Sequence, residues 1–325
     1  MRLCFPHGLA TQNHFNVWMR MFSRPLSRAF TKGYGSDKRT MKSMNIEKAT
    51  RVLIEVKELF DELNIVFFLR HGTCLGAVRD GELIPWDDDL DIGSIIGMND
   101  LTERSVYETA DILRRAGFEA TLLRTDFYIA VELTKSGIPV DWTCYRVIEG
   151  NIIQYPAVKI PAQLYYDLKT IRFLGGEFFV PNPPEKYLQL KYGSEWQLPK
   201  ETGFEKDIIN SIPESVIPKR SGALSGVFKF LFPNKYTTRI RVLDHDREPV
   251  ELAEVTVVGF NHQPTDHRGY ARFDLPNEDY YALVISRFGE EEILYAEFLR
   301  PGKSYCYVPS ANEKSGRTHV MEEEN

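Results

Sequence analysis

The sequence predicts two folded parts, an α+β domain over residues 45–200 and a smaller all-β sandwich over residues 237–310. In the first part, runs with apolar residues three and four positions apart, which favour helices, alternate with short apolar runs that are typical of buried strands. In the second part, short strand-like runs follow one another with turns between them, as in a β-sandwich. A linker with several proline and glycine residues is expected at 201–236, and a disordered tail at 311–325.

Composition and charge are those of an ordinary globular protein. The chain has 325 residues, 43% of them hydrophobic and 12% aromatic, which is enough for a core domain and a smaller one. Its net charge of −6 argues against a protein whose whole surface binds nucleic acid. The four cysteines form no CxxC pair, so neither a zinc ribbon nor a disulfide framework is indicated. No apolar run is long enough to predict a transmembrane helix.

The beginning of the chain differs from the rest. Residues 1–44 are basic, with Asp37 as their only acid, and they carry serine and aromatic residues. Such a segment has some character of a transit peptide or a surface-binding helix, but it lacks the apolar core of a secretory signal. We expect a disordered extension, and the sequence leaves open whether translation starts at Met1, Met41 or Met44.

Helices and strands alternate through the first half of the α+β domain. The apolar spacing from Asn45 to Leu63 predicts a helix, with Asn45 as its cap. The apolar run IVFFL at 65–69 predicts a buried strand, and LDIGSII at 90–96 predicts a second one. The residues between them, 73–79, are compatible with a short helix.

The second half continues the same pattern. Asn99 is the expected cap of a helix that runs to Arg115, and the segments 127–134 and 138–147 form a predicted hairpin. A short helix with proline at its start and glycine past its end is expected at 183–193. The strand-like runs of the all-β part are residues 239–244, 253–260, 270–275, 280–288, 291–299 and 305–309.

A dense group of aspartates, Asp87, Asp88, Asp89 and Asp91, directly follows Trp86. Side chains two positions apart on a strand point to the same face, so Asp89 and Asp91 present their carboxylates together. Two such charges repel each other unless a cation lies between them. Hard divalent cations prefer oxygen ligands, and Mg²⁺ often uses one or two carboxylates together with substrate phosphates. Alone, the group could equally be a solvated acidic loop.

A later acid favours the metal site over the solvated loop. Asp141 stands between Val140 and Trp142 in a predicted strand, and an acid in a buried strand is costly unless it is paired or bound to metal. We therefore predict a three-carboxylate metal cluster of Asp89, Asp91 and Asp141.

Upstream of the aspartates the sequence predicts an anion site. Gly72 and Thr73 follow a buried strand and open a short helix. Glycine lets the backbone approach a ligand closely, and the free N–H groups at a helix start favour phosphate. Arg79, at the end of that helix, could contact the same anion with a two-pronged guanidinium.

These residues resemble a known family. The string HGTCLGAVRDGELIPWDDDLDIG, residues 71–93, resembles the signature of the LicD family, which includes the fukutin and fukutin-related proteins. The wider nucleotidyltransferase pattern falls on Gly72-Thr73, on Asp89 with Asp91, and on Asp141. A second string, FVPNPPEKYLQLKYGSEWQLP, looks like a later segment of the same family. The resemblance implies the nucleotidyltransferase fold shared with DNA polymerase β, a mixed sheet flanked by helices.

The resemblance also implies a reaction. Such proteins transfer a phosphorylated alcohol, such as phosphocholine or a polyol phosphate, from a CDP-activated donor to a hydroxyl of a glycan or glycolipid. Mg²⁺ or Mn²⁺, expected as two ions, would be held by Asp89, Asp91 and Asp141, and Asp141 would also help to deprotonate the acceptor. The residues expected to bind the donor phosphates or the nucleotide are His71, Gly72, Thr73, Arg79, Trp86 and Asp88.

Several of these assignments keep an alternative. Trp86 could stack on a base or simply pack, and His71 could be structural. One of Asp87 and Asp88 could cap the turn or bind a water next to the metal. Two other functions also stay open: transfer of a nucleotide from a nucleoside triphosphate to a small acceptor, and a catalytically inactive glycan-binding scaffold. The intact acids argue against the scaffold.

The all-β part resembles the carboxypeptidase regulatory-like domain, a transthyretin-like or immunoglobulin-like sandwich. The turn Thr265-Asp266 followed by Gly269 carries most of this resemblance. We expect an accessory domain that positions the acceptor or packs against the catalytic domain. Because bacterial LicD-like enzymes are cytoplasmic and the sequence shows no membrane anchor, we expect a cytoplasmic protein that could associate with the membrane surface.

Overall fold

The computed structural model describes residues 44–200, 208–213, 215–217, 237–310, 317–318 and 320–324. The expected N-terminal extension, apart from Met44, and most of the expected linker lie outside these residues. Met44 is buried in the core of the first domain. The described residues of the linker also bury apolar side chains, those of Ile208, Ile209 and Ile217.

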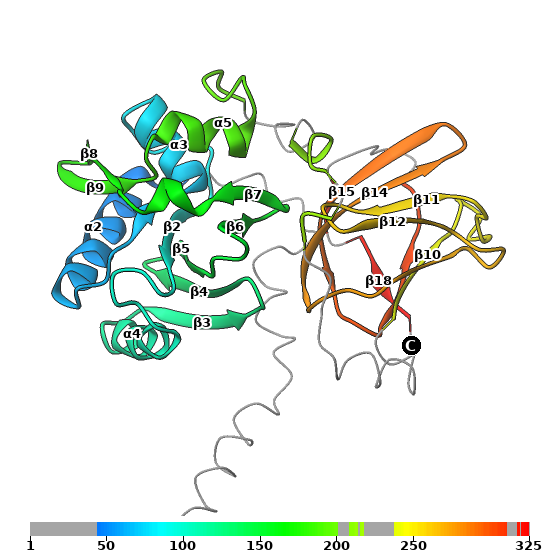
Figure 1. Ribbon diagram of the computed structural model, residues 1–325, viewed down its shortest axis with the longest axis horizontal. Coiled ribbons are helices and arrows are strands. Elements are labelled where there is room, and N and C mark those ends of the chain that lie inside the picture. Colours follow the sequence, from blue (N-terminus) through cyan, green and yellow to red (C-terminus); the bar gives the residue numbers. More distant parts are fainter. Residues whose placement is uncertain are drawn as a thin grey trace, which may run out of the picture. The chain divides into compact units, whose positions relative to one another are not determined.

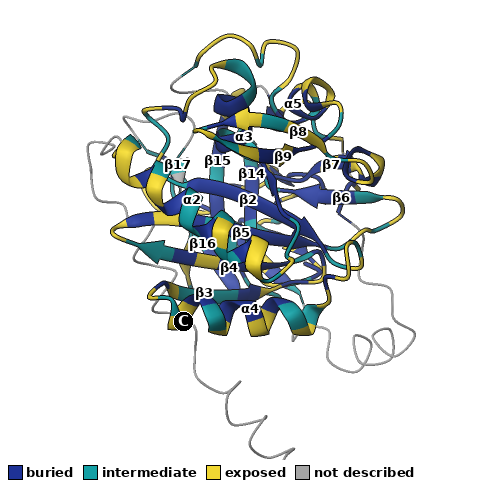
Figure 2. Cartoon of the chain, turned by 90° about the vertical axis from the view of Figure 1, so that its left-hand side faces the viewer, coloured by how far each residue is buried: buried dark blue, intermediate teal, exposed yellow. Residues whose placement is uncertain are grey.

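The first domain is built on one mixed sheet, as predicted (Figure 1). Its strand order is β1-β2-β5-β4-β3. Strands β2 and β5 are parallel, while the other neighbours are antiparallel. The strands are β1 (Phe68–Leu69), β2 (Leu90–Ile95), β3 (Glu119–Arg124), β4 (Tyr128–Lys135) and β5 (Ile138–Tyr145). Every residue of β2 is buried, so the strand that carries Asp91 lies inside the domain (Figure 2).

Four helices belong to this domain, and their apolar sides account for much of its core. They are α2 (Ile46–Glu62), α3 (His71–Arg79), α4 (Glu103–Arg115) and α5 (Pro184–Tyr192). The expected cap of α2 is confirmed, because the Asn45 side chain accepts a hydrogen bond from Lys48 N. None of the helices in the described part of the chain is both long and apolar enough to cross a membrane.

The start of α4 corrects the sequence expectation. Asn99 lies in a turn with a left-handed backbone (φ 48°), and the helix begins four residues later. Thr102 is the cap: its side chain accepts from Ser105 N, and the Ser105 hydroxyl in turn accepts from Thr102 N. This reciprocal pair satisfies two N–H groups at once, which Asn99 could not do from its position.

Two small hairpins complete the first domain, and the sequence analysis predicted neither of them. They are formed by β6 (Asn151–Gln154) with β7 (Val158–Pro161) and by β8 (Lys169–Phe173) with β9 (Gly176–Val180). A 3₁₀ turn, η2 (Ala162–Tyr165), lies between them. Most residues of β8 are exposed or half-buried, so the strand lacks the clear apolar alternation that marks a strand in a sequence.

The C-terminal region is a pair of β-sheets, with strand orders β13-β10-β16-β18 and β12-β11-β14-β15-β17. The apolar residues between them form a second core, which includes Val242, Val255, Leu283 and Leu294. The strands are β10 (Thr238–Val242), β11 (Glu254–Val257), β12 (Asn261–Pro264), β13 (Tyr270–Phe273), β14 (Asp279–Arg287), β15 (Glu290–Leu299), β16 (Ser304–Tyr307), β17 (Arg317–Thr318) and β18 (Glu322–Glu323).

The described part of the tail is ordered, which differs from the disorder expected for residues 311–325. Strand β17 extends one sheet by pairing with β15, and β18 extends the other by pairing with β16. Between them, Val320 N and Met321 N both donate hydrogen bonds of 2.9 Å to the buried carboxylate of Glu297. A buried carboxylate is costly without partners, and the tail supplies them.

Candidate metal and nucleotide site

The acids of the site share one face of the mixed sheet. Asp91 on β2 and Asp141 on β5 are direct partners in the parallel register, and Asp141 is in turn the antiparallel partner of Glu132 on β4. The three carboxylates therefore form a row across three neighbouring strands. Sequence analysis missed Glu132, because only the register of the hairpin brings it beside Asp141.

Three of the aspartates could hold a metal ion. Asp87, Asp89 and Asp91 each offer a carboxylate oxygen, and these oxygens lie within 4.8 Å of one another. All are hard oxygen donors, as Mg²⁺ and Mn²⁺ require. We call these three residues the acidic triad. The sequence analysis predicted a cluster with Asp141 as its third member; in the structure Asp87 lies with Asp89 and Asp91, and Asp141 pairs with Arg70.

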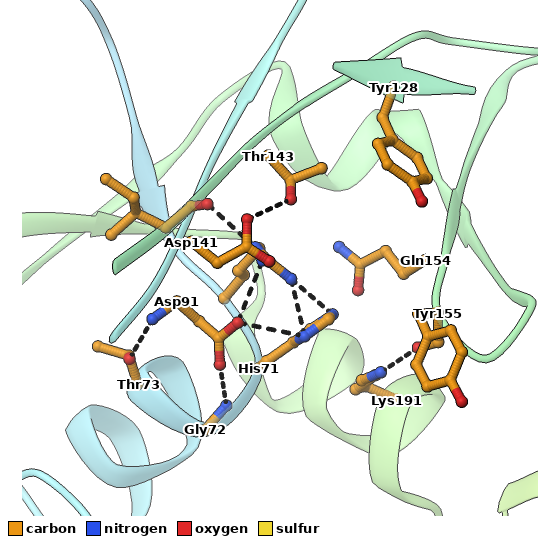
Figure 3. Close-up of polar contacts among 12 residues, drawn as sticks. His71, Gly72, Thr73, Asp91, Tyr128, Asp141, Thr143, Gln154, Tyr155 and Lys191 are labelled. Carbon is orange, nitrogen blue, oxygen red and sulfur yellow. Dashed lines mark hydrogen bonds and ion pairs between the residues drawn. The ribbon is translucent and has the colours of Figure 1, made fainter. Parts of the chain in front are cut away.

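The glycine and threonine upstream position the acids (Figure 3). Gly72 N donates to Asp91 Oδ2 at 3.2 Å, and the hydroxyl of Thr73 accepts from Asp91 N at 2.8 Å. A Cβ atom on Gly72 would come within 1.9 Å of Asp87 Oδ2, so the absence of a side chain there lets the Asp87 carboxylate lie over the start of α3. Gly72 and Thr73 thus contact the carboxylates and backbone of the acidic triad.

Arg70 lies between the acids, and the sequence analysis overlooked it. Its Nη2 atom is 3.1 Å from Asp91 Oδ1 and 2.5 Å from Asp141 Oδ2. Its Nε donates to Ile92 O at 3.0 Å. Although Nη2 is this close to two carboxylates, it makes no hydrogen bond of good angle, so the contact is chiefly an ion pair. Arg70 is 2% exposed, and the charge it carries is therefore matched inside the protein.

The pKa values differ strongly between Asp91, which Arg70 stabilises as a carboxylate, and the other two acids of the triad. Burial would raise the pKa of Asp91, but Arg70 and His71 outweigh it and lower that pKa to about 2. Burial, Asp91 and Asp88 raise the pKa of Asp87 to about 8. Burial and the neighbouring aspartates also raise the pKa of Asp89 well above its usual range. A cation bound to the acidic triad would relieve this repulsion.

His71 begins α3 in a strained conformation. Its φ is 41°, in the left-handed region that residues with a side chain rarely adopt. Its N–H donates to the hydroxyl of Tyr187 on α5 at 2.9 Å, which fixes the entry to the helix. Burial, Lys191 and Arg70 lower the pKa of His71 to about 3, so its ring is neutral at neutral pH. The ring lies beside Asp91, as Figure 3 shows.

Helix α5 contributes a cation to the same region. Lys191 is 4% exposed, and its Nζ donates to the carbonyl oxygen of Tyr155. Its charge lowers the pKa values of both His71 and Asp91, which places it in the electrostatic field of the site (Figure 3). The second family-like string, 179–199, contains this lysine, but sequence reasoning read that string as a whole and did not single out Lys191.

Of the remaining predicted residues, Asp88 lies beside the acidic triad, where its charge helps to raise the pKa values of Asp87 and Asp89. Arg79 ends α3, and its Nε and Nη2 donate to the carboxylate of Asp80 at 2.8 and 2.6 Å. That end of the nine-residue helix is about 12 Å from its start, at 1.5 Å per residue. Trp86 is half-buried against the core, and Asp88 is exposed.

Part of the chain that carries this site matches a known protein family. Residues 64–183 match the family model described as LicD/FKTN/FKRP, nucleotidyltransferase domain. We call these residues the LicD-type region. It contains the whole mixed sheet, the acidic triad and Arg70. The resemblance drawn from the sequence motifs is thereby confirmed for this part of the chain, while the kinship of the C-terminal sandwich stays a prediction.

Individual relatives match over shorter stretches. The human ribitol 5-phosphate transferase FKRP is 24% identical over 143 residues, which are 42% of this chain and 29% of the relative. The ribitol-5-phosphate transferase FKTN of Macaca fascicularis is 34% identical over 71 residues, 22% of this chain and 15% of the relative. An uncharacterized protein of Rickettsia prowazekii, RP689, is 28% identical over 159 residues, 45% of this chain and 54% of the relative. The chain thus spans about half of these relatives or less.

Proposed function

We propose that this protein is a metal-dependent transferase that moves a phosphorylated alcohol from a CDP-activated donor to a hydroxyl of a glycan. The observation that carries the proposal is the acidic triad at the start of α3, inside the LicD-type region. The names of two relatives, both ribitol 5-phosphate transferases, favour a polyol phosphate over phosphocholine as the transferred group.

The acidic triad would hold the divalent ion, for which its oxygen ligands suit Mg²⁺ or Mn²⁺. When bound, such an ion offsets the negative charge that develops on the phosphoryl oxygens during transfer. The protein's own groups add to this. Lys191 supplies a buried positive charge near Asp91, and Gly72 and Thr73 hold that carboxylate in place.

Asp141 and Glu132, the other two acids of the row, would act on the acceptor hydroxyl. Asp141 is engaged by Arg70 on one oxygen and by the Thr143 hydroxyl, at 2.9 Å, on the other, which makes it a positioning group for the acceptor hydroxyl. Glu132 is exposed as a residue, yet partial burial of its carboxyl and the neighbouring Asp141 raise its pKa to about 7. A pKa close to the working pH suits a general base, so we assign the acceptor proton to Glu132.

The C-terminal sandwich has a supporting role in this proposal. We infer that it is a carboxypeptidase regulatory-like accessory domain that helps to present the acceptor. Its two-sheet architecture and the turn at Thr265 and Asp266 support this. There Asp266 Oδ1 accepts hydrogen bonds from Arg268 N and Tyr270 N and closes the turn.

A thermal-shift panel tests the reaction class. CDP-ribitol, CDP-glycerol, CDP-choline, CTP and ATP are added to the full chain with and without Mg²⁺ or Mn²⁺. A ligand at 100 times its dissociation constant stabilises the folded state by about 2.7 kcal/mol. We expect a metal-dependent shift with CDP-ribitol or CDP-glycerol that Asp89→Asn abolishes. Asp111→Asn, an exposed acid paired with Arg114 on α4, is the matched control.

The other outcomes point elsewhere. A shift with a triphosphate alone would favour nucleotide transfer to a small acceptor. No shift with any nucleotide, at several metal concentrations, would favour the non-catalytic glycan-binding function.

A further inference from the structure

We propose that Arg70 is a fixed cation between Asp91 and Asp141, so that the site takes one divalent ion, on the acidic triad, instead of two. This rests on the proposed metal-dependent function and specifies how many ions it uses. Two-ion sites place their cations about 3.5–4 Å apart between clustered carboxylates. In this protein the position between the two strand acids belongs to a side chain.

The geometry of the guanidinium carries this proposal. A single nitrogen of Arg70, Nη2, lies 3.1 Å from an oxygen of Asp91 and 2.5 Å from an oxygen of Asp141. It therefore bridges the two carboxylates that the parallel register sets side by side. An ion shared by the same two oxygens would have to occupy the volume of this nitrogen.

The arginine is held there by contacts that do not involve the carboxylates. Its Nε donates to Ile92 O on β2, and its own backbone N–H donates to Asp91 O at 3.2 Å. Its guanidinium carbon lies 6.0 Å from the ring centre of Tyr145. Gly93 keeps the space beside it open: a Cβ atom there would come within 2.7 Å of the Phe68 ring and within 3.3 Å of Arg70 Cδ. A side chain so anchored and 2% exposed does not swing aside at low cost.

Charge leads to the same conclusion. Guanidinium cannot lose its proton in a protein, so the positive charge beside Asp91 and Asp141 is permanent. A second divalent ion at this place would meet like charge as well as occupied volume. Within the acidic triad only Asp91 also pairs with Arg70, whose other ion pair is with Asp141. Asp87 and Asp89 stand before β2, so two of the three triad carboxylates are left for the ion.

Counting bound ions tests the proposal without any substrate. The full chain is titrated with Mn²⁺, and free Mn²⁺ is measured by electron paramagnetic resonance. We expect one ion per wild-type chain, and one again in Arg70→Lys, which keeps the charge. Arg70→Met, which keeps the length but not the charge, should bind a second ion on the freed carboxylates. Arg146→Met is the matched control, since it removes an arginine bonded to Glu103, and it should bind one ion.

A further variant decides the matter even if Arg70→Met fails to fold. Because Asp141 pairs with Arg70, Asp141→Asn should still bind one ion, whereas Asp89→Asn should lose at least tenfold in Mn²⁺ affinity. Two ions on the wild type, or loss of an ion in Asp141→Asn, would overturn the proposal while leaving metal-dependent transfer intact. No ion on the wild type would overturn both.

Discussion

The two domains both bury carboxylates, but they treat them differently. In the C-terminal sandwich, Glu297 accepts hydrogen bonds from two backbone N–H groups of the tail, and Glu292 is bonded by Tyr307 and Arg317. In the acidic triad, the carboxylates of Asp87 and Asp89 face further carboxylates, which raise their pKa values in addition to burial. The sandwich acids find their hydrogen-bond donors within the chain, whereas the crowding of the triad acids suits a cationic ligand.

The largest effect that this contrast predicts is at Asp89. Asp89→Asn should lower kcat/KM with a CDP-polyol donor roughly a thousandfold, because a bound ion contributes several kcal/mol to the transition state and each 1.36 kcal/mol is tenfold. Steady-state kinetics at saturating Mg²⁺ measures this, with Asp111→Asn alongside. A loss of less than tenfold would remove Asp89 from the set of metal ligands.

A glycine substitution tests how the triad is held. Gly72→Ala should lower Mn²⁺ affinity about 10- to 100-fold, the range found when groups that orient metal ligands are lost. The reason is that the new Cβ would displace the carboxylate of Asp87. Isothermal titration measures the affinity. Gly176→Ala is the control, since its nearest neighbour would be at an ordinary 3.4 Å. Equal affinities in both variants would mean that Asp87 is not a ligand.

The sandwich should respond to pH at Glu297. Burial raises the pKa of this acid to about 7, against 4.5 in an unfolded chain. Its contribution to folding is thus fully present below pH 4.5 and lost as pH rises through 7. This amounts to about 3 kcal/mol at most.

Denaturant unfolding of the full chain between pH 5 and pH 8 measures this loss. Glu297→Gln, which cannot ionise, should reduce the slope of the profile, while Glu291→Gln at an exposed position of β15 should not. The slope that remains is expected from Asp87 and Glu132, whose pKa values are also raised. If Glu297→Gln kept the wild-type slope, the source of the pH dependence would lie elsewhere.

The smallest effect is expected at Arg79. Its guanidinium pairs with Asp80 at the far end of α3, away from the acidic triad. Arg79→Gln should therefore change the KM for the donor by less than about threefold. A tenfold rise in KM, with stability unchanged, would restore the phosphate-binding role that the sequence suggested.

The sequence predicted correctly those features that depend on residues close together in the chain. The spacing of apolar residues predicts α2, Asn45 is the confirmed cap, and the turn at Ser136 and Gly137 joins the predicted hairpin of β4 and β5. It was less informative where contacts with other elements determine the length of a strand. The strand predicted at 65–69 shortens to Phe68–Leu69, because only these residues pair with β2.

The site shows the same division. Asp89 and Asp91 could be chosen from their spacing in the sequence, although Asp89 stands just before β2. Arg70 could not, because its partners on β2 and β5 are distant in sequence and meet it only through the register of the sheet. Asp87 was not among the predicted ligands, since it lies further from β2 and no periodicity governs where its side chain points.

The bond from His71 N to the Tyr187 hydroxyl joins residues that are 116 positions apart. A ribosome releases His71 long before it reaches α5. During synthesis, the start of α3 therefore waits for its last partner until nearly the whole first domain has emerged. The helix start that carries Gly72, a partner of Asp91, is thus fixed late, and we expect a nascent chain that stops short of α5 to bind metal more weakly.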